Sequence, residues 1–289
     1  MDKLITLVIV VYEMRIIESP TIMSLVKISK NYNFNNVCVI IYDNSRKKQE
    51  EFSNLSFEFL YIHDETNGGL CAAYNYALQY SIENEIKWLM LLDQDTYLTL
   101  EYYEKAISTC QKLFYIDDVV CILPRTVTES YHLISPTKVS IWGWGQGIGD
   151  IVGTCSISIT GINSGTLLRT SFMSLLGGFN IDFKLDMLDH WYFFEIFKMG
   201  LKVYVLDISM VHSLSVSQFS SISKSRYISI LDSEVLFMKK FKSKKSINIY
   251  MFRLLIRFFK QIMTLRNKEI AMLTLKSAFK VFNFILCGY

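Results

Sequence analysis

The chain has 289 residues, of which 51% are hydrophobic and 20% charged, and it contains only 13 Gly and 3 Pro. This composition excludes a disordered or collagen-like chain, and the length allows one large domain, or a domain with an appendage. Residues 224–289 hold 14 Lys or Arg against 3 Asp or Glu, whereas residues 1–223 hold 16 against 24. A basic C-terminal part on an acidic body predicts a contact with something anionic.

The first apolar run, residues 4–11, is too short to span a bilayer and follows an acidic residue. It also lacks the basic start of a secretory signal. We therefore expect a buried strand there, no transmembrane segment, and a cytoplasmic location. The six cysteines form no CxxC pair, so we expect buried free thiols and no zinc site.

The first half of the chain alternates apolar or β-branched runs with helical patterns. Strands are predicted at residues 4–11, 37–42, 57–62 and 88–92, and helices after Pro20 and over residues 69–80 and 100–114. Strands that alternate with helices predict an α/β fold, with a mostly parallel sheet that helices cover on both faces.

The second half is less regular. The glycine-rich residues 142–147 predict a loop, residues 164–168 and 202–206 predict strands, and residues 190–199 predict a helix. Farther on, Arg253, Arg257 and Lys260 recur on one face of an apolar helix over residues 247–262, and Lys276 and Lys280 repeat the pattern. We predict two domains, residues 1–215 and a helical, basic extension over residues 216–289.

An acidic pair, Asp93 and Asp95, follows the predicted strand at residues 88–92. Ligands of open parallel sheets bind beyond the carboxyl ends of the strands. Two carboxylates there can hold a hard cation such as Mg²⁺ or Mn²⁺, which prefers oxygen ligands. The alternative is a solvated turn that carries two acids.

Two other segments are candidates for a ligand site. The paired glycines after Asn67 let a backbone approach a ligand, and the helix that follows favours a phosphate at its N-terminus. Asp43 ends the second strand, where a carboxylate can accept hydrogen bonds from a nucleobase or ribose. The alternatives are an ordinary turn entering a helix and an Asx turn.

Taken in order, these segments resemble family 2 glycosyltransferases with the GT-A fold, and within that family the bacterial O-antigen and capsule rhamnosyltransferases. The resemblance covers residues 3–215. The residues that carry it are Val10-Val11-Tyr12-Glu13, Asp43-Asn44-Ser45, Asn67-Gly68-Gly69, Asp93-Gln94-Asp95, Asn163–Arg169, Gly177–Asn180, Asp186-Met187-Leu188-Asp189, Gly200 and His212.

The resemblance implies a nucleoside-diphosphate-sugar donor, either dTDP-rhamnose or a UDP-sugar, and a divalent cation, Mn²⁺ or Mg²⁺. The donor-binding residues that it implies are Val10, Tyr12, Glu13, Asp43, Asn67, Gly69, Asn75 and Asp93. The metal ligands that it implies are Asp93, Asp95 and His212. The alternative for His212 is a structural histidine at a strand end.

The resemblance also implies that Asp189 is the catalytic base of an inverting transfer, where it takes the proton of the acceptor hydroxyl. A helix cap is the alternative for Asp189, and Asp186 is its rival as the base. Asp186, His190 and Trp191 would lie on the acceptor side. Trp191 and Glu195 depart from the family pattern of a second acid and a basic residue, and Trp191 either stacks on a sugar or packs in the core.

The activity implied is transfer of a sugar to a hydroxyl of a lipid-linked glycan in bacterial surface polysaccharide synthesis. The basic helices either lie on an anionic membrane surface, at the inner face of the cell membrane, or pack on protein such as a second copy. No nucleic-acid-binding motif is present. The alternatives are a nucleotidyltransferase, whose basic loop after the first strand is missing here, and a catalytically silent GT-A-like scaffold of a polysaccharide assembly complex.

Overall fold

The computed structural model describes residues 3–32, 34–50, 52, 55–128, 130–140, 143–149, 151–211 and 222–287. The chain divides into two compact units. The first unit consists of Met1–Lys138 and Gln146–Ser213, and the second of Val139–Gly145 and Leu214–Tyr289. The segment between residues 139 and 145 therefore belongs with the C-terminal helices, although it lies far from them in the sequence.

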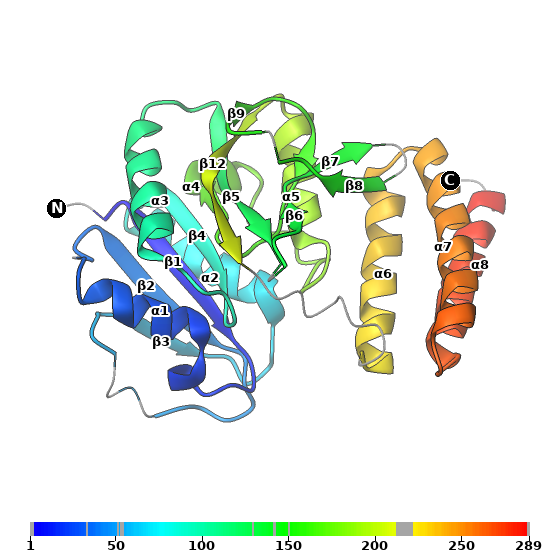
Figure 1. Ribbon diagram of the computed structural model, residues 1–289, viewed down its shortest axis with the longest axis horizontal. Coiled ribbons are helices and arrows are strands. Elements are labelled where there is room, and N and C mark those ends of the chain that lie inside the picture. The colour runs from blue at the N-terminus through cyan, green and yellow to red at the C-terminus, as the bar shows by residue number, and fades with distance from the viewer. Residues whose placement is uncertain are drawn as a thin grey trace. The chain divides into compact units, whose positions relative to one another are not determined.

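A central sheet organises the first unit (Figure 1). Its described strands are β1 (Ile5–Val11), β2 (Val37–Asp43), β3 (Leu60–His63), β4 (Trp88–Asp93), β5 (Val119–Val127), β6 (Leu133–Ser135), β9 (Gly153–Cys155), β11 (Leu167–Arg169) and β12 (Lys202–Val211). The strand order is β3-β2-β1-β4-β11-β5-β12-β9, and β6 pairs with β5. β1 to β4 are mutually parallel and β12 is parallel to β5, whereas β11 runs antiparallel between β4 and β5.

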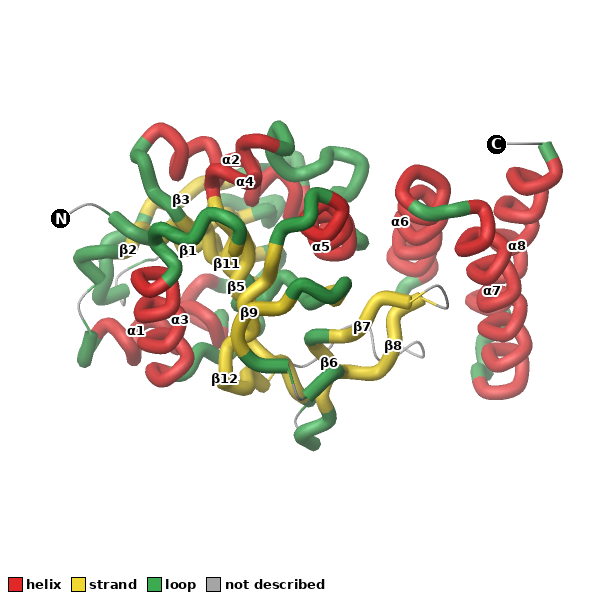
Figure 2. The backbone as a smooth tube through the Cα atoms, turned by 90° about the horizontal axis from the view of Figure 1, so that it is seen from above, coloured by secondary structure: helices red, strands yellow, loops and turns green. Residues whose placement is uncertain are grey.

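Helices cover both faces of this sheet: α1 (Pro20–Ser29) and α3 (Leu100–Lys112) lie on one face, and α2 (Gly69–Glu83) and α4 (Thr170–Leu175) on the other (Figure 2). The alternation of side chains along β1 explains the two layers. Ile5, Leu7 and Ile9 join the apolar core beneath α1 and α3. Thr6 points the other way and accepts a 2.7 Å hydrogen bond from Ser81 of α2. The predicted fold class is confirmed.

The prediction of a loop at residues 142–147 is wrong. Gly143–Gly147 form strand β8, in a small sheet of order β10-β7-β8 with β7 (Thr137–Ser140) and β10 (Ile159–Thr160). The glycine content favours a loop locally, but backbone pairing with β7 decides the outcome. Trp142 lies outside the described residues.

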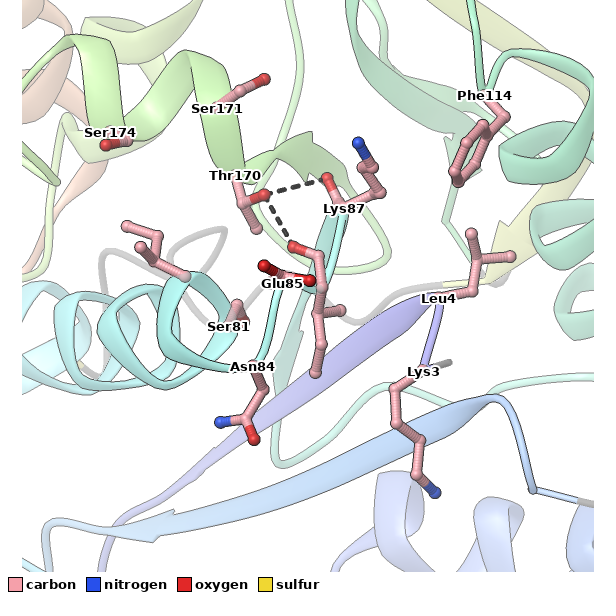
Figure 3. A pocket seen from close by; sticks show the side chains of 12 residues that line it. Lys3, Leu4, Ser81, Asn84, Glu85, Lys87, Phe114, Thr170, Ser171 and Ser174 are labelled. Atoms are coloured by element: carbon pink, nitrogen blue, oxygen red, sulfur yellow. Dashed lines mark hydrogen bonds between the residues drawn. The ribbon is translucent and has the colours of Figure 1, made fainter. Parts of the chain in front are cut away.

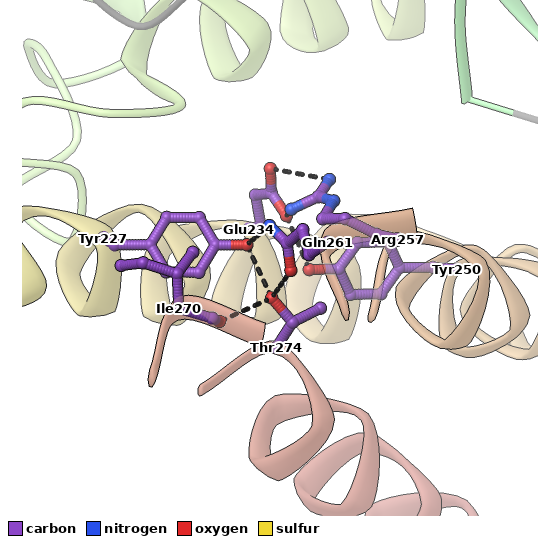
Figure 4. Close-up of polar contacts among 7 residues, drawn as sticks. All are labelled: Tyr227, Glu234, Tyr250, Arg257, Gln261, Ile270 and Thr274. Atoms are coloured by element: carbon purple, nitrogen blue, oxygen red, sulfur yellow. Dashed lines mark hydrogen bonds and ion pairs between the residues drawn. The ribbon is translucent and has the colours of Figure 1, made fainter. Parts of the chain in front are cut away.

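Three helices make up most of the second unit: α6 (Lys224–Phe241), α7 (Lys244–Thr264) and α8 (Glu269–Leu286). Glu234 of α6 is buried, and both of its carboxylate oxygens accept hydrogen bonds from Arg257 of α7, at 3.0 and 3.3 Å (Figure 4). The hydroxyl of Tyr250 donates to the same carboxylate at 2.8 Å. Burial lowers the pKa of Arg257, but the Glu234 carboxylate outweighs it and raises that pKa.

A second polar cluster joins all three helices beside this ion pair (Figure 4). The amide of Gln261 donates to the hydroxyl of Tyr227 at 2.9 Å, and the hydroxyl of Thr274 donates to the amide oxygen of Gln261 at 2.7 Å. Because buried polar groups are costly unless they are paired, these contacts fix the register of α6, α7 and α8. Across the described residues, no helix is both long enough and apolar enough to cross a membrane.

Candidate active site

The carboxyl ends of β1, β2 and β4 bring together residues that the sequence analysis singled out. In the register of these parallel strands, Val11 is aligned with Asp43 of β2 and Val10 with Asp93 of β4. Parallel strands end at the same edge of a sheet, so residues far apart in the sequence meet there. Tyr12 follows directly and is exposed at the same edge.

The loop after β1 is fixed to its neighbours on both sides. The backbone N–H of Tyr12 donates to the side-chain oxygen of Gln94 at 2.8 Å. Glu13 has a φ of 48°, which is unusual for a side chain other than glycine. Its N–H donates to the hydroxyl of Ser45 at 2.8 Å, and its carboxylate accepts from the N–H of Arg46 at 3.1 Å. Glu13 therefore holds the ends of β1 and β2 together.

Gln94 is a positioning residue that the sequence analysis missed. It lies between two acids that attract attention, and its own side chain has no obvious chemistry. The backbone carbonyl oxygen of Gln94 also accepts a hydrogen bond from the hydroxyl of Ser19 at 2.6 Å, so Gln94 links the loop after β4 to the start of α1. The sequence indicates this role only by placing a long amide side chain directly after a predicted strand, where it can bridge two strand ends and a shorter or apolar side chain cannot.

Asp43 is buried at the end of β2 and accepts three hydrogen bonds. The donors are the N–H of Ser45 at 2.9 Å, the amide of Gln49 at 3.0 Å and the hydroxyl of Tyr61 at 2.8 Å. The bond from Ser45 is the Asx turn considered above. Burial, and then the hydrogen bond to Asp43, raise the pKa of Tyr61 to about 12, although a backbone bond to Gln49 lowers it. A carboxylate offers roughly four acceptor positions, and the protein's own groups occupy three of them at this buried residue.

The turn into α2 contacts the loop that precedes α5 (Leu188–Lys198). Gly69 has a φ of 77°, and a Cβ there would lie 2.5 Å from the carbonyl oxygen of Lys184. The same oxygen accepts from the N–H of Cys71 at 3.2 Å. The requirement for glycine at position 69 is therefore explained by the protein's own backbone. Asn67, with a φ of 51°, begins this turn.

Asn75, expected at the ribose and diphosphate, is bonded to the backbone of Phe179. Its side chain donates to the carbonyl oxygen of Phe179 at 3.0 Å and accepts from the N–H of Phe179 at 2.7 Å. These two bonds and the bond from Cys71 to Lys184 form what we call the α2 clamp. The clamp ties the donor-side motif to the segment that leads to Asp189.

The carboxylates of Asp95 and Asp189 act on that of Asp93, which lies at the carboxyl end of β4. Burial, followed by the negative charges of Asp95 and Asp189, raises the pKa of Asp93 to about 7, although a hydrogen bond with Ser164 lowers it. Asp189 comes from a helix 96 residues farther along the chain than Asp93, so the fold gathers this negative charge from its two halves.

Such a donor set fits a hard divalent cation, because its oxygens are the ligands that Mg²⁺ and Mn²⁺ prefer and a cation would offset the mutual repulsion. Within the part of the chain that the structure describes, no group of three or more His, Cys, Asp or Glu side chains is arranged to hold a metal ion. His212, the third expected ligand, lies outside the described residues. Asp93 and Asp95 are thus the described residues that would hold the ion.

Asp189 lies in the first turn of α5, and it is not the helix cap. The N-cap is Met187, which has a left-handed backbone and no capping side-chain bond. The Asp189 carboxylate accepts from the N–H of His190 at 2.7 Å, and the His190 ring is hydrogen-bonded to the Thr160 hydroxyl at 2.7 Å. Asp186, the rival base, lies before the helix and is partly exposed.

Trp191, which was expected on the acceptor side, is buried. Its side chain is only 5% exposed, so of the two alternatives the structure favours packing in the core. Glu195 is buried on the next turn and pairs with Lys198 at 3.1 Å. Tyr74 was also missed as a site residue. It is fully buried, and burial together with the charges of Asp93 and Asp189 raises its pKa well above the usual range.

A pocket of about 760 Å³ lies at the opposite edge of the sheet, near the amino ends of β1 and β4 (Figure 3). Thr170 closes one side of it, with its hydroxyl bonded to the carbonyl oxygens of Ile86 and Lys87 at 2.7 and 3.2 Å. Lys3, Lys87 and Glu85 line it at the surface. None of the carboxylates of the candidate site reaches this edge, so we assign the pocket no role in the chemistry.

Comparison with known proteins identifies the family of the chain. The sequence profile of glycosyl transferase family 2 matches residues 8–157, which include Asp43, Asp93 and Asp95. The chain belongs to glycosyl transferase family 2. The motifs from residue 163 onward, Asp189 among them, lie beyond the matched residues. No curated protein sequence matches the chain significantly.

Solved structures show the same fold at low sequence identity. The mannosyltransferase PcManGT from Pyrobaculum calidifontis, in complex with GDP-Man and Mn²⁺, is 13% identical with a TM-score of 0.54, over 96% of this chain and 75% of that chain. Residues 1–349 of S. aureus TarS, in complex with UDP-GlcNAc, are 11% identical with a TM-score of 0.50, over 98% and 90%. The expected GT-A fold is confirmed, whereas the rhamnosyltransferase branch stays a prediction.

Proposed function

We propose that this member of glycosyl transferase family 2 is a metal-dependent, inverting glycosyltransferase. It moves a sugar from a nucleoside-diphosphate donor, dTDP-rhamnose or otherwise a UDP-sugar, to a hydroxyl of a lipid-linked glycan in bacterial surface polysaccharide synthesis. It works in the cytoplasm at the inner face of the cell membrane. The observation that carries the proposal is that Asp93, at the carboxyl end of the buried strand β4, is acted on by the negative charges of both Asp95 and Asp189.

The donor would lie across the ends of β1, β2 and β4. Asp43, at the end of β2, would accept from a base N–H, and Tyr12, exposed at the same edge, would offer an aromatic face to the base or ribose. Gln94 and Glu13 hold these strand ends in place. That GDP-Man and UDP-GlcNAc occupy two neighbours of this fold supports a nucleotide sugar as the class of donor.

Asp93 and Asp95 would hold Mn²⁺ or Mg²⁺, which when bound neutralises charge on the departing diphosphate. The acceptor hydroxyl attacks the anomeric carbon from the face opposite the diphosphate, so one carbon–oxygen bond forms as the other breaks and the configuration inverts. Asp189 accepts the proton that the hydroxyl loses. The N–H of His190 is bonded to the Asp189 carboxylate and fixes its orientation.

Calorimetric titration of dTDP, UDP and GDP into the whole chain, with and without Mn²⁺, tests the donor site. We expect one nucleotide to bind, at least about tenfold more tightly with Mn²⁺, because the cation joins two carboxylates to a diphosphate. Asp95→Asn should lose the effect of Mn²⁺. Asp118→Asn is the matched control, since Asp118 is an exposed acid that pairs with Lys202 elsewhere on the surface.

Release of nucleoside diphosphate from the matching sugar donor, with lipid-linked glycans as acceptors, then tests the transfer. A well-folded chain that binds none of the three nucleotides contradicts the proposal. So does nucleotide binding that neither Mn²⁺ nor Asp95→Asn changes. The scaffold alternative would be established by two results together. The chain would bind nucleotide normally without turnover, and variants at Asp95 and Asp189 would still join a polysaccharide assembly complex.

A further inference from the structure

One face of α7 exposes large apolar side chains to water. Phe252, Ile256, Phe259 and Met263 are 60–78% exposed. They recur at i, i+4, i+7 and i+11, which places all four on one side of the helix. The opposite side carries the buried Ile247, Tyr250, Leu254 and Gln261. The helix is therefore apolar both toward the unit's core and away from it.

The neighbouring helix α8 repeats the pattern. Met272, Phe279, Phe282 and Leu286 are 42–67% exposed, whereas Ile270, Ala271, Thr274, Ser277, Ala278 and Val281 are buried. The two helices lie side by side in both views (Figures 1 and 2). We call these eight exposed residues of α7 and α8 the apolar face. Exposed apolar residues scattered singly are ordinary, but four on one side of each of two neighbouring helices mark an interaction site.

The contacts within the second unit do not account for the apolar face. Arg257 and Tyr250 reach Glu234 of α6 from the other side of α7 (Figure 4). On α8, Lys280 reaches Asp232 of α6 at 3.0 Å, and Phe284 packs under Lys239 of α6. Because α6 lies on the side that carries these polar contacts, the apolar face points away from it.

The charges around the apolar face have one sign. Residues 224–289 contain three acids, Asp232, Glu234 and Glu269, and each is paired with a cation of the same unit. Residues 224–289 therefore carry a net charge of +11 within their own sequence. Exposed cations lie at the ends of α7 and along the edges of the apolar face: Lys244, Lys245, Lys260, Arg266, Lys268 and Lys276.

We propose that the apolar face of α7 and α8 lies on the surface of an anionic lipid bilayer. Helices that bind in a membrane interface insert an apolar side among the acyl chains and place cations beside anionic headgroups. The apolar face and its cations supply both requirements. The inference rests on the proposed location at the inner face of the cell membrane and names the surface that binds there, and binding of the bilayer does not require the chain to be active.

Charge argues against a second copy of the chain as the occupant. A two-fold symmetric dimer would bring the same surface patch of each copy together. Each copy would then bring cations at the edges of its apolar face, such as Lys260 and Lys276, against those of the other. Like charges at an interface oppose association, whereas an anionic bilayer attracts the same surface.

Flotation of the whole chain with vesicles tests the proposal, with no nucleotide or sugar present. The vesicles are phosphatidylcholine alone, or phosphatidylcholine with about one quarter phosphatidylglycerol. We expect binding to the anionic vesicles at least about tenfold stronger than to the neutral ones, and weaker binding as salt is raised. The triple variant Ile256→Gln, Phe259→Gln, Met263→Gln should lose about tenfold or more of this binding, because it removes the inserted side chains.

Leu175→Gln with Ile181→Gln is the matched control, because these side chains of the first unit are 70% and 81% exposed and lie outside the apolar face. It should bind vesicles like the original chain. Lys260→Glu with Lys276→Glu should lose binding while the apolar residues stay. Asp95→Asn should bind vesicles normally, which separates this test from the proposed activity.

Three outcomes would overturn the proposal. The first is the absence of binding to anionic vesicles. The second is equal binding by the triple variant and the original chain. The third is a dimer, in sedimentation, that the triple variant converts to a monomer, since the apolar face would then be an interface between copies. Circular dichroism and an unchanged denaturation midpoint show that each variant is folded.

Discussion

Each unit of this chain contains a carboxylate that is shielded from water, and the charges around the two carboxylates are opposite in sign. Glu234 in the second unit accepts bonds from Arg257 and Tyr250, so its charge is compensated within the fold. Asp93 in the first unit faces the carboxylates of Asp95 and Asp189, which raise its pKa. The comparison separates a charge that holds helices together from a charge that the fold leaves for a ligand to balance.

The largest effect that this comparison predicts is on the rate of sugar transfer, when Asp189 is replaced. Asp189→Asn should lower the rate of sugar transfer about 10²- to 10⁴-fold, because the acceptor hydroxyl loses its general base. Its stability should be equal to that of the original chain or higher, since one negative charge leaves the cluster. Initial rates with saturating donor, together with urea denaturation, measure both quantities. A destabilised Asp189→Asn would contradict a role for this acid in binding and catalysis alone.

Glu234→Gln should have the reverse effect, with a loss of about 3 kcal/mol in the free energy of unfolding, because Arg257 is left without its anionic partner. Denaturant unfolding, followed by helical circular dichroism, measures this loss. Nucleotide binding at the first unit should be unchanged. The double variant Glu234→Gln, Arg257→Met should recover part of the stability, because no unpaired charge remains. If the single variant is as stable as the original chain, the ion pair does not hold α6 to α7.

The α2 clamp allows a sharper test of the first unit. Gly69→Ala should cost about 2 kcal/mol of stability, because the backbone φ is positive and the new methyl group meets the carbonyl of Lys184. Gly177→Ala is the matched control, since its φ of 78° is similar and nothing lies within 4 Å of the added carbon. It should cost about 1 kcal/mol. Equal losses in thermal or urea unfolding would show that the contact with Lys184 contributes nothing.

The smallest expected effect is at Tyr74. Its buried hydroxyl has no hydrogen-bond partner among the described residues, and it lies near the negative charges of Asp93 and Asp189. Tyr74→Phe should raise the free energy of unfolding by about 1 kcal/mol in nucleotide-free protein, because an unpaired polar atom is removed. A loss of stability would mean that the hydroxyl is bonded in solution. Differential scanning calorimetry without nucleotide or metal makes the measurement.

Much of the first unit follows from local patterns in the sequence. Residues 5–11 and 88–93 are apolar runs bounded by polar residues, so their strand character and the position of Asp93 at a strand end are predictable. The sequence does not reveal which distant groups such residues meet. Asn75 is paired with Phe179, 104 positions away, and Gln94 with the backbone of Tyr12, 82 positions away.

Strand β8 and Trp191 show two other limits of prediction. The glycines of residues 143–147 favour a loop on local grounds, but pairing with β7 makes this segment a strand. An aromatic residue close to the proposed catalytic base suits either sugar stacking or core packing, and only burial distinguishes the two. Each of these outcomes depends on tertiary contacts, which neither propensity nor spacing contains.

The α2 clamp also bears on how the two substrates affect each other. The proposed donor residues Asn67 and Gly69 lie at the start of α2, and Asp189 follows the segment that Asn75 and Cys71 hold. An acceptor that shifts the segment before α5 must therefore strain or break hydrogen bonds to the helix beside the donor site. The two substrates should consequently bind with mutual cooperativity, and by thermodynamic linkage the donor's effect on acceptor affinity equals the acceptor's effect on donor affinity.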